Sequence, residues 1–146
     1  MDKRFWLAAV AYLAPTFPLG YMWHLVIFAD RYAAMEVYRE QLLFPMGLAA
    51  MFTQAVLFAW AYPRLFGKLA DWKRGALGFG VFFGFLAWSF AVLSVAAKYR
   101  MNSVVDFAVL ETGFTVLQFL VVSPCVALAY RHVHPAHPSG VPGIPA

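Results

Sequence analysis

One carboxylate and one imidazole lie inside apolar stretches that are long enough to cross a membrane. Glu111 falls within residues 104–130, and His24 falls within residues 5–29. Ionisable side chains at membrane depth are costly, face the interior of a helix bundle and mark binding sites or proton paths. Histidine changes its charge near neutral pH, so a His24–Glu111 pair would hold one mobile proton there. These two side chains are the first candidates for chemistry.

Two glutamines and a second carboxylate extend this candidate site. Gln118 follows Glu111 by seven positions and shares its helix face. At about 1.5 Å of rise per residue, His24 and Glu111 lie roughly 8–10 Å below the outer surface, and Gln54 and Gln118 lie roughly 20 Å below it. The sequence therefore predicts an outer polar layer, a deeper amide layer and Asp106 at the outer mouth.

The composition predicts membrane-spanning helices, which would hold these residues inside the bilayer. The chain has 146 residues, of which 63% are hydrophobic and 12% are charged, whereas soluble domains have about 25% charged residues. The apolar stretches are residues 5–29, 42–62, 75–97 and 104–130. They predict an all-α integral membrane protein, an antiparallel four-helix transmembrane bundle formed by residues 1–131. The Pro-, Gly- and His-rich residues 132–146 are expected to form a disordered tail.

Basic residues are concentrated at one expected end of the bundle. That end holds Lys3, Arg4, Arg64, Lys68, Lys73, Arg74 and Arg131, and the other holds Arg31, Arg39, Lys98 and Arg100. The positive-inside rule then places both termini in the cytoplasm of a multi-pass protein. Because the excess of positive charge lies in loops that set orientation, it does not indicate a nucleic-acid partner.

Prolines and a polar connection predict local features of the helices. Pro15 and Pro18 are expected to kink the first helix, and Pro63 is expected to end the second helix at Tyr62. Residues 30–41 are expected to contain a short amphipathic turn at the membrane surface.

A stripe of small residues in the third helix predicts a close helix contact. Gly80 and Gly84 have the small-xxx-small spacing, which lets two helix backbones approach each other. Packing inside the bundle and contact with a second copy or a larger membrane complex both fit this stripe.

The sequence favours a protein without enzymatic activity or a cofactor. Bis-histidine haem ligation requires paired histidines in the spans, where His24 stands alone. A di-iron bundle requires several glutamates and Glu-x-x-His motifs, which one membrane glutamate does not supply. His132, His134 and His137 are close enough in sequence to share a metal, but we expect an unstructured tail there. Cys125 excludes an internal disulfide because it is the only cysteine.

Several of these features resemble those of small, uncharacterised bacterial inner-membrane proteins with four helices. The features are His24, Tyr38-Arg39, Tyr62-Pro63, the glycine-rich start of the third helix, Glu111 and Tyr130-Arg131. The resemblance covers residues 5–131 and implies a four-helix bundle in a bacterial cytoplasmic membrane with no known activity. Small multidrug transporters are similar in size, but their membrane glutamate is in the first helix, so their function is not transferred.

Two functions from different classes follow from these residues. The leading one is binding or transport of a small ligand or a proton through an outward-facing pocket, with His24 and Glu111 as the titrating pair and Gln54 and Gln118 as its floor. The alternative is an accessory or assembly subunit of a larger membrane complex, in which these side chains join helices through hydrogen bonds.

Overall fold

The computed structural model describes residues 2–69 and 71–131. Within them the chain forms helices and no strand. By length and composition, the helical runs able to cross a membrane are Lys3–Ile27, Phe44–Leu65, Trp72–Lys98 and Val104–Ala129. The all-α class and the number of candidate spans are therefore confirmed. The predicted tail, including His132, His134 and His137, lies outside the described residues.

Two of the four spans contain a turn of π-helix. The first span is α1 (Lys3–Met22) followed by the π-helix η1 (Trp23–Ile27), and the short helix α2 (Ala29–Met35) comes next. The second span is α3 (Phe44–Leu65). The third span is α4 (Trp72–Trp88), the π-helix η2 (Ser89–Leu93) and α5 (Ser94–Lys98). The fourth is α6 (Val104–Ala129).

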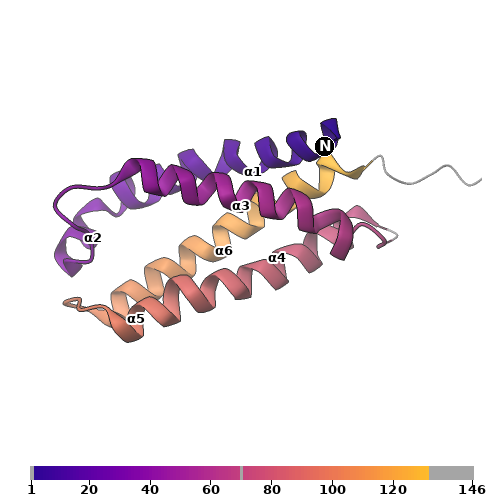
Figure 1. Ribbon diagram of the computed structural model, residues 1–146. Coiled ribbons are helices and arrows are strands. Elements are labelled where there is room, and N and C mark those ends of the chain that lie inside the picture. The colour runs from indigo at the N-terminus through magenta and orange to yellow at the C-terminus, as the bar shows by residue number, and fades with distance from the viewer. Residues whose placement is uncertain (1, 70, 132–146) are drawn as a thin grey trace, which may run out of the picture.

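The fourth span is the central element of the fold. α6 packs against α1 and against α4, while α3 packs mainly on α1 (Figure 1). Within an 18-residue stretch of α6, 33% of the residues are buried, a larger share than in the other candidate spans, because α6 has neighbours on two sides. Its polar side chains are thus placed between helices.

Aromatic side chains join α3 to α4 at one end of the bundle. The Phe58 and Phe83 rings lie 4.8 Å apart, and the Phe66 and Phe79 rings lie 6.0 Å apart. From this end α3 and α4 diverge, as their ribbons in Figure 1 show. The opposite end of the bundle has a cluster of its own around Tyr32 and Phe107.

The helices continue through prolines that were expected to disturb them. α1 contains Pro15 and Pro18, and its irregular turn, η1, follows at Trp23. The predicted end of the second helix at Tyr62 is wrong, because α3 continues through Pro63 to Leu65. Proline lacks the N–H that would bond to the carbonyl four residues earlier, here that of Ala59. The Tyr130 hydroxyl donates to this carbonyl at 2.7 Å and so replaces the missing donor.

The glycine stripe contacts α6 within the chain. A Cβ atom at Gly80 would lie 2.7 Å from Ser123 Oγ, and one at Gly84 would lie 3.5 Å from the Phe119 ring. A larger residue at position 80 would force the Ser123 side chain to shift, so glycine favours this close approach of α4 to α6. Contact with a second copy through the same face stays a prediction.

Candidate functional site

His24 lies in the π-helical turn at the end of the first span. The turn is wider than an α-helical turn, because the Phe28 N–H donates to the carbonyl of Trp23, five residues earlier, at 3.1 Å. π-Helical turns of this kind occur often at functional sites. The His24 Nδ1 atom lies 2.9 Å from the Gly20 carbonyl oxygen. Since a carbonyl only accepts, Nδ1 carries a proton and donates it there.

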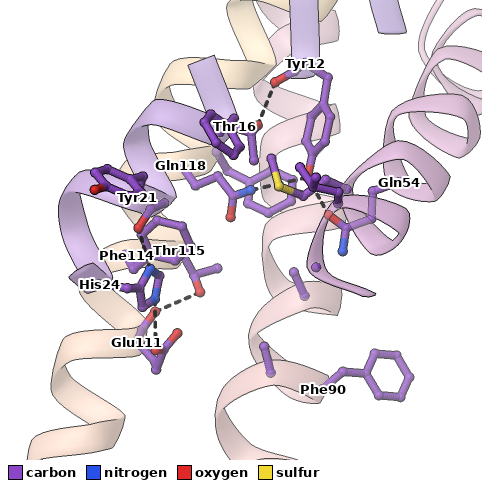
Figure 2. A pocket seen from close by; sticks show the side chains of 18 of the residues that line it. Tyr12, Thr16, Tyr21, His24, Gln54, Phe90, Glu111, Phe114, Thr115 and Gln118 are labelled. Carbon is purple, nitrogen blue, oxygen red and sulfur yellow. Dashed lines mark hydrogen bonds and ion pairs between the residues drawn. The ribbon is translucent and has the colours of Figure 1, made fainter. Parts of the chain in front are cut away.

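The other ring nitrogen of His24 faces Glu111 of α6. Nε2 lies 3.2 Å from Glu111 Oε1, with side-chain exposures of 19% and 13% (Figure 2). The Tyr32 hydroxyl of α2 donates to the same oxygen at 2.8 Å. Side chains from η1, α2 and α6 thus meet at one carboxylate oxygen.

The His24–Glu111 contact holds one exchangeable proton. With Nδ1–H fixed on Gly20, this proton lies on Nε2, as an imidazolium beside a carboxylate, or on Glu111, as a carboxylic acid beside an imidazole. Both forms have zero net charge, which lowers the cost of burying the pair.

Two tyrosines cover the pair from outside the spans. The rings of Tyr32 and His24 lie 5.0 Å apart, and Tyr38 stacks on Tyr32 with centroids 5.1 Å apart and planes at 12°. Burial raises the pKa of both phenols, and the negative charge of Glu111 raises the pKa of each further. Both hydroxyls therefore stay protonated at neutral pH.

The deeper polar layer is organised by Tyr12, which is buried. Its hydroxyl donates to Gln54 Oε1 at 2.5 Å and accepts from Gln118 Nε2 at 3.3 Å. The two glutamines that the sequence placed at one depth are thus bridged by a phenol from α1. Thr16, one turn later, donates to the Tyr12 carbonyl at 2.6 Å.

Both polar layers open into one cavity. Its volume is about 650 Å³, and its wall comes from α1, α3, α4, α6, both π-helical turns and the connection after α2. Figure 2 shows His24 and Glu111 in one part of this wall and Tyr12, Gln54 and Gln118 in another. Most other lining side chains are aliphatic or aromatic.

Four of the five predicted site residues line this cavity. They are His24, Gln54, Glu111 and Gln118. Asp106 does not line it; its carboxylate is 50% exposed and lies 3.4 Å from Arg31 Nη2. Asp106 lies in the first turn of α6, where the Ser103 hydroxyl accepts its backbone N–H.

Sequence reasoning missed Tyr12 and Tyr32 as parts of the site. The one sequence signal for Tyr12 is its position four residues before Thr16, which places these two polar side chains on one helix face. No comparable signal exists for Tyr32, which was expected only to face the membrane surface. Its contact with Glu111 depends on how α2 folds back over the bundle.

A metal centre has no support in the described part of the chain. Within residues 2–69 and 71–131, no three His, Cys, Asp or Glu side chains are grouped closely enough to hold a metal ion. What the site offers instead is hydrogen bonding and one exchangeable proton.

Comparison with known proteins gives no relative for this chain. No protein family, no curated protein and no solved structure matches it.

Proposed function

We propose that the chain is a multi-pass protein of a bacterial inner membrane that binds, and passes, a small ligand or a proton through an outward-facing cavity. In this proposal the four spans form an antiparallel bundle with both termini in the cytoplasm. The observation that carries the proposal is the contact between His24 and Glu111 in the wall of the cavity.

The size and lining of the cavity support ligand binding. Small-molecule sites have volumes of about 300–1,000 Å³ and largely apolar walls with a few polar groups that orient the ligand. The cavity has a volume of about 650 Å³ and two polar groups of side chains. It therefore has the size and chemistry of a binding site.

Polar atoms left over after the internal hydrogen bonds favour a site over helix–helix bonding alone. Among the described residues, Glu111 Oε2, Gln118 Oε1 and Gln54 Nε2 make no hydrogen bond. Gln54 is an exposed residue, the glutamate and Gln118 atoms are not fully buried either, and all three residues line the cavity. Side chains that only join helices would use all their polar atoms in hydrogen bonds to each other. The cavity thus offers a ligand two acceptors and one amide donor.

Native mass spectrometry of protein released gently from its own membrane tests this proposal. We expect a discrete small molecule on the wild type and its loss from Glu111→Gln, which removes the acceptor charge. Asp106→Asn is the matched control, because it removes a carboxylate that lies outside the cavity. The midpoint temperature of thermal unfolding of the same proteins, measured between pH 5 and pH 8, shows whether proton binding depends on Glu111.

The proposal is wrong if Glu111→Gln retains the same molecules as the wild type and melts with the same pH dependence. Loss of the molecule from Asp106→Asn as well would show an effect of surface charge rather than of the cavity.

A second candidate function, an accessory subunit of a larger complex, is favoured by a hollow on the other side of the bundle. The hollow lies between α4 and α6, has a volume of about 660 Å³ and is lined almost entirely by apolar side chains, Leu77, Val81 and Leu120 among them. A stoichiometric second protein that is retained regardless of Glu111 in the same spectra would support this alternative.

A further inference from the structure

The charged groups of the cavity wall point to the charge of its ligand. The wall contains one carboxylate, Glu111, and one imidazole, His24, and its described residues include no lysine or arginine. Its other titratable side chains are Tyr12, Tyr21 and Tyr38. A buried charge requires a partner of opposite sign, and Glu111 supplies one for a cation.

Few other charged or titratable side chains face the His24–Glu111 pair. α3 and the lining part of α4 and η2 contribute no titratable side chain to the wall. From α2, Tyr32 donates to Glu111, while Arg31 pairs with Asp106 outside the cavity. An anion would therefore meet no permanent positive charge in the wall.

The remainder of the wall suits an apolar body attached to such a cation. Phe114 packs edge-on against His24 with ring centroids 4.4 Å apart, and the rings of Phe44 and Phe90 line the wall on α3 and η2. Aromatic faces attract cations as well as apolar groups, most strongly where water is excluded.

The cavity opens sideways between α3 and η2. Leu48 on α3 and Phe90 on η2 both line it and are 51% and 67% exposed, and α3 packs mainly on α1 rather than on η2. The ring contacts that join α3 to α4 lie at the other end, near Phe58 and Phe83. A molecule dissolved in the bilayer would enter here without crossing the polar ends of the bundle.

Binding of a cation has a consequence for the proton of the pair. The pair is neutral with one proton between Nε2 and Oε1, since Nδ1–H is engaged by Gly20. A cation added to this pair would leave one net positive charge in an apolar cavity. Release of the Nε2 proton to water restores neutrality: cation and protonated pair give a cation–carboxylate pair, neutral His24 and one free proton.

We propose that the cavity binds an amphipathic cation, an ammonium group on an apolar body, which enters from the membrane between α3 and η2 and displaces the proton held by His24 and Glu111. This inference rests on the proposed function, since it names the ligand class and the proton stoichiometry of the same site.

Calorimetric titration of the protein in lipid nanodiscs tests it with 4-phenylbutyl-trimethylammonium. This probe has no proton of its own, so every proton released on binding comes from the protein. Titration in two buffers of different ionisation enthalpy gives the number released. We expect about one proton per bound probe, and an association constant that rises about tenfold per pH unit while the pair is protonated.

Two comparisons separate charge from shape. The neutral isostere, with a tert-butyl group in place of trimethylammonium, should bind at least tenfold more weakly and with no dependence on pH. Glu111→Gln should abolish saturable binding of the ammonium probe, whereas Asp106→Asn should keep both affinity and proton release. Empty nanodiscs correct for partition into lipid.

Gly47→Phe tests the location of the site independently of the titrating pair. Gly47 lines the cavity on α3, and a Cβ there would meet no atom within 4 Å. The added ring should therefore occupy the cavity without a clash and weaken probe binding at least tenfold, with the same proton release per bound probe. This variant keeps the inference testable if Glu111→Gln does not fold.

Equal affinity for the ammonium probe and its neutral isostere would overturn the inference, as would cation binding without proton release. If the probe does not bind but native mass spectra show a Glu111-dependent ligand, the proposed function stands and the cationic ligand class is wrong. If neither is seen, both fail.

Discussion

The hydroxyl of Tyr32 explains why Glu111 keeps its position in the cavity wall. Tyr32 is fully buried, and its hydroxyl donates to Glu111 Oε1. We regard it as a positioning residue, because it acts through the carboxylate. Such a hydrogen bond to a charged acceptor contributes about 1.5–3 kcal/mol when buried.

Tyr32→Phe should lower stability at neutral pH and flatten its decline at high pH. Burial raises the pKa of the Tyr32 phenol above its ordinary value of 10.0. Its contribution to stability is thus fully present below pH 10 and is lost as the pH rises toward the raised pKa. We expect the variant to lose about 1–3 kcal/mol at pH 7 and to melt with a shallower pH dependence between pH 9 and pH 12.

Thermal unfolding in detergent at fixed ionic strength measures both effects. Tyr99→Phe is the matched control, because the Tyr99 side chain is 65% exposed and should change neither quantity. A Tyr32→Phe profile parallel to that of the wild type up to pH 12 would contradict the assignment.

At the residue scale, the sequence predicted the His24–Glu111 contact but not the two tyrosines of the site, Tyr12 and Tyr32. Depth along a helix follows from residue count, so two ionisable groups at one depth can be paired from the sequence. The direction of a phenol does not follow from count. Tyr12 and Tyr32 occur among many aromatic residues, and only packing decides which hydroxyl reaches an acceptor.

At the scale of elements, the bond between α6 and the end of α3 compensates for Pro63. Tyr130 donates to the carbonyl of Ala59, and its ring stacks on Tyr62 with centroids 5.5 Å apart. α3 therefore extends to Leu65 because a residue 71 positions from Ala59 supplies the absent donor. A local sequence pattern does not reveal a hydrogen-bond donor that is this distant in the chain.

A double-mutant cycle on Pro63 and Tyr130 tests this compensation. Tyr130→Phe keeps the ring but removes the donor, and should cost about 1 kcal/mol of unfolding free energy. Pro63→Ala restores an N–H that can bond to Ala59 within the helix, so Tyr130→Phe should cost close to nothing in that background. Chemical unfolding in mixed micelles gives the four free energies. An equal cost in both backgrounds would show that the hydroxyl does not replace the proline's missing donor.

The two π-helical turns could not be predicted from the sequence either. η1 turns His24 toward Gly20 and Glu111, and η2 brings Phe90 to the cavity wall. A π-turn inserts one residue into a helix, which shifts the helical pattern after it. In a membrane span nearly every position is apolar, so this shift leaves no mark in the pattern of hydrophobic residues.

On the scale of the whole molecule, hydrogen bonds join segments that are distant in the chain at the two ends of the bundle. At one end, Asn102 donates through its backbone N–H to Met35 at 3.0 Å, which joins the connection before α6 to α2. At the other end, Tyr130 reaches α3, and the negative charge of Asp2 acts on the Tyr130 phenol. His24 and Glu111 lie toward the Asn102 end.

Most basic residues belong to the end that holds Tyr130. Of the eleven lysine and arginine residues, those expected there are Lys3, Arg4, Arg64, Lys68, Lys73, Arg74 and Arg131. Basic residues are retained on the cytoplasmic side during insertion, and in the orientation that we propose the Asn102 end, with the proton-holding pair, therefore faces outward.

Single cysteines should report this orientation in intact cells. In a Cys125→Ala background, which removes the only native cysteine, we expect a membrane-impermeant maleimide to label Arg100→Cys from outside. Lys68→Cys should be labelled only after the membrane is opened, and both side chains are exposed, so burial does not limit the reaction. The reverse pattern would place His24 and Glu111 toward the cytoplasm and contradict the proposed orientation. Labelling of both positions from outside would show that the chain between them crosses the membrane an even number of times, which is incompatible with Trp72–Lys98 as a single span.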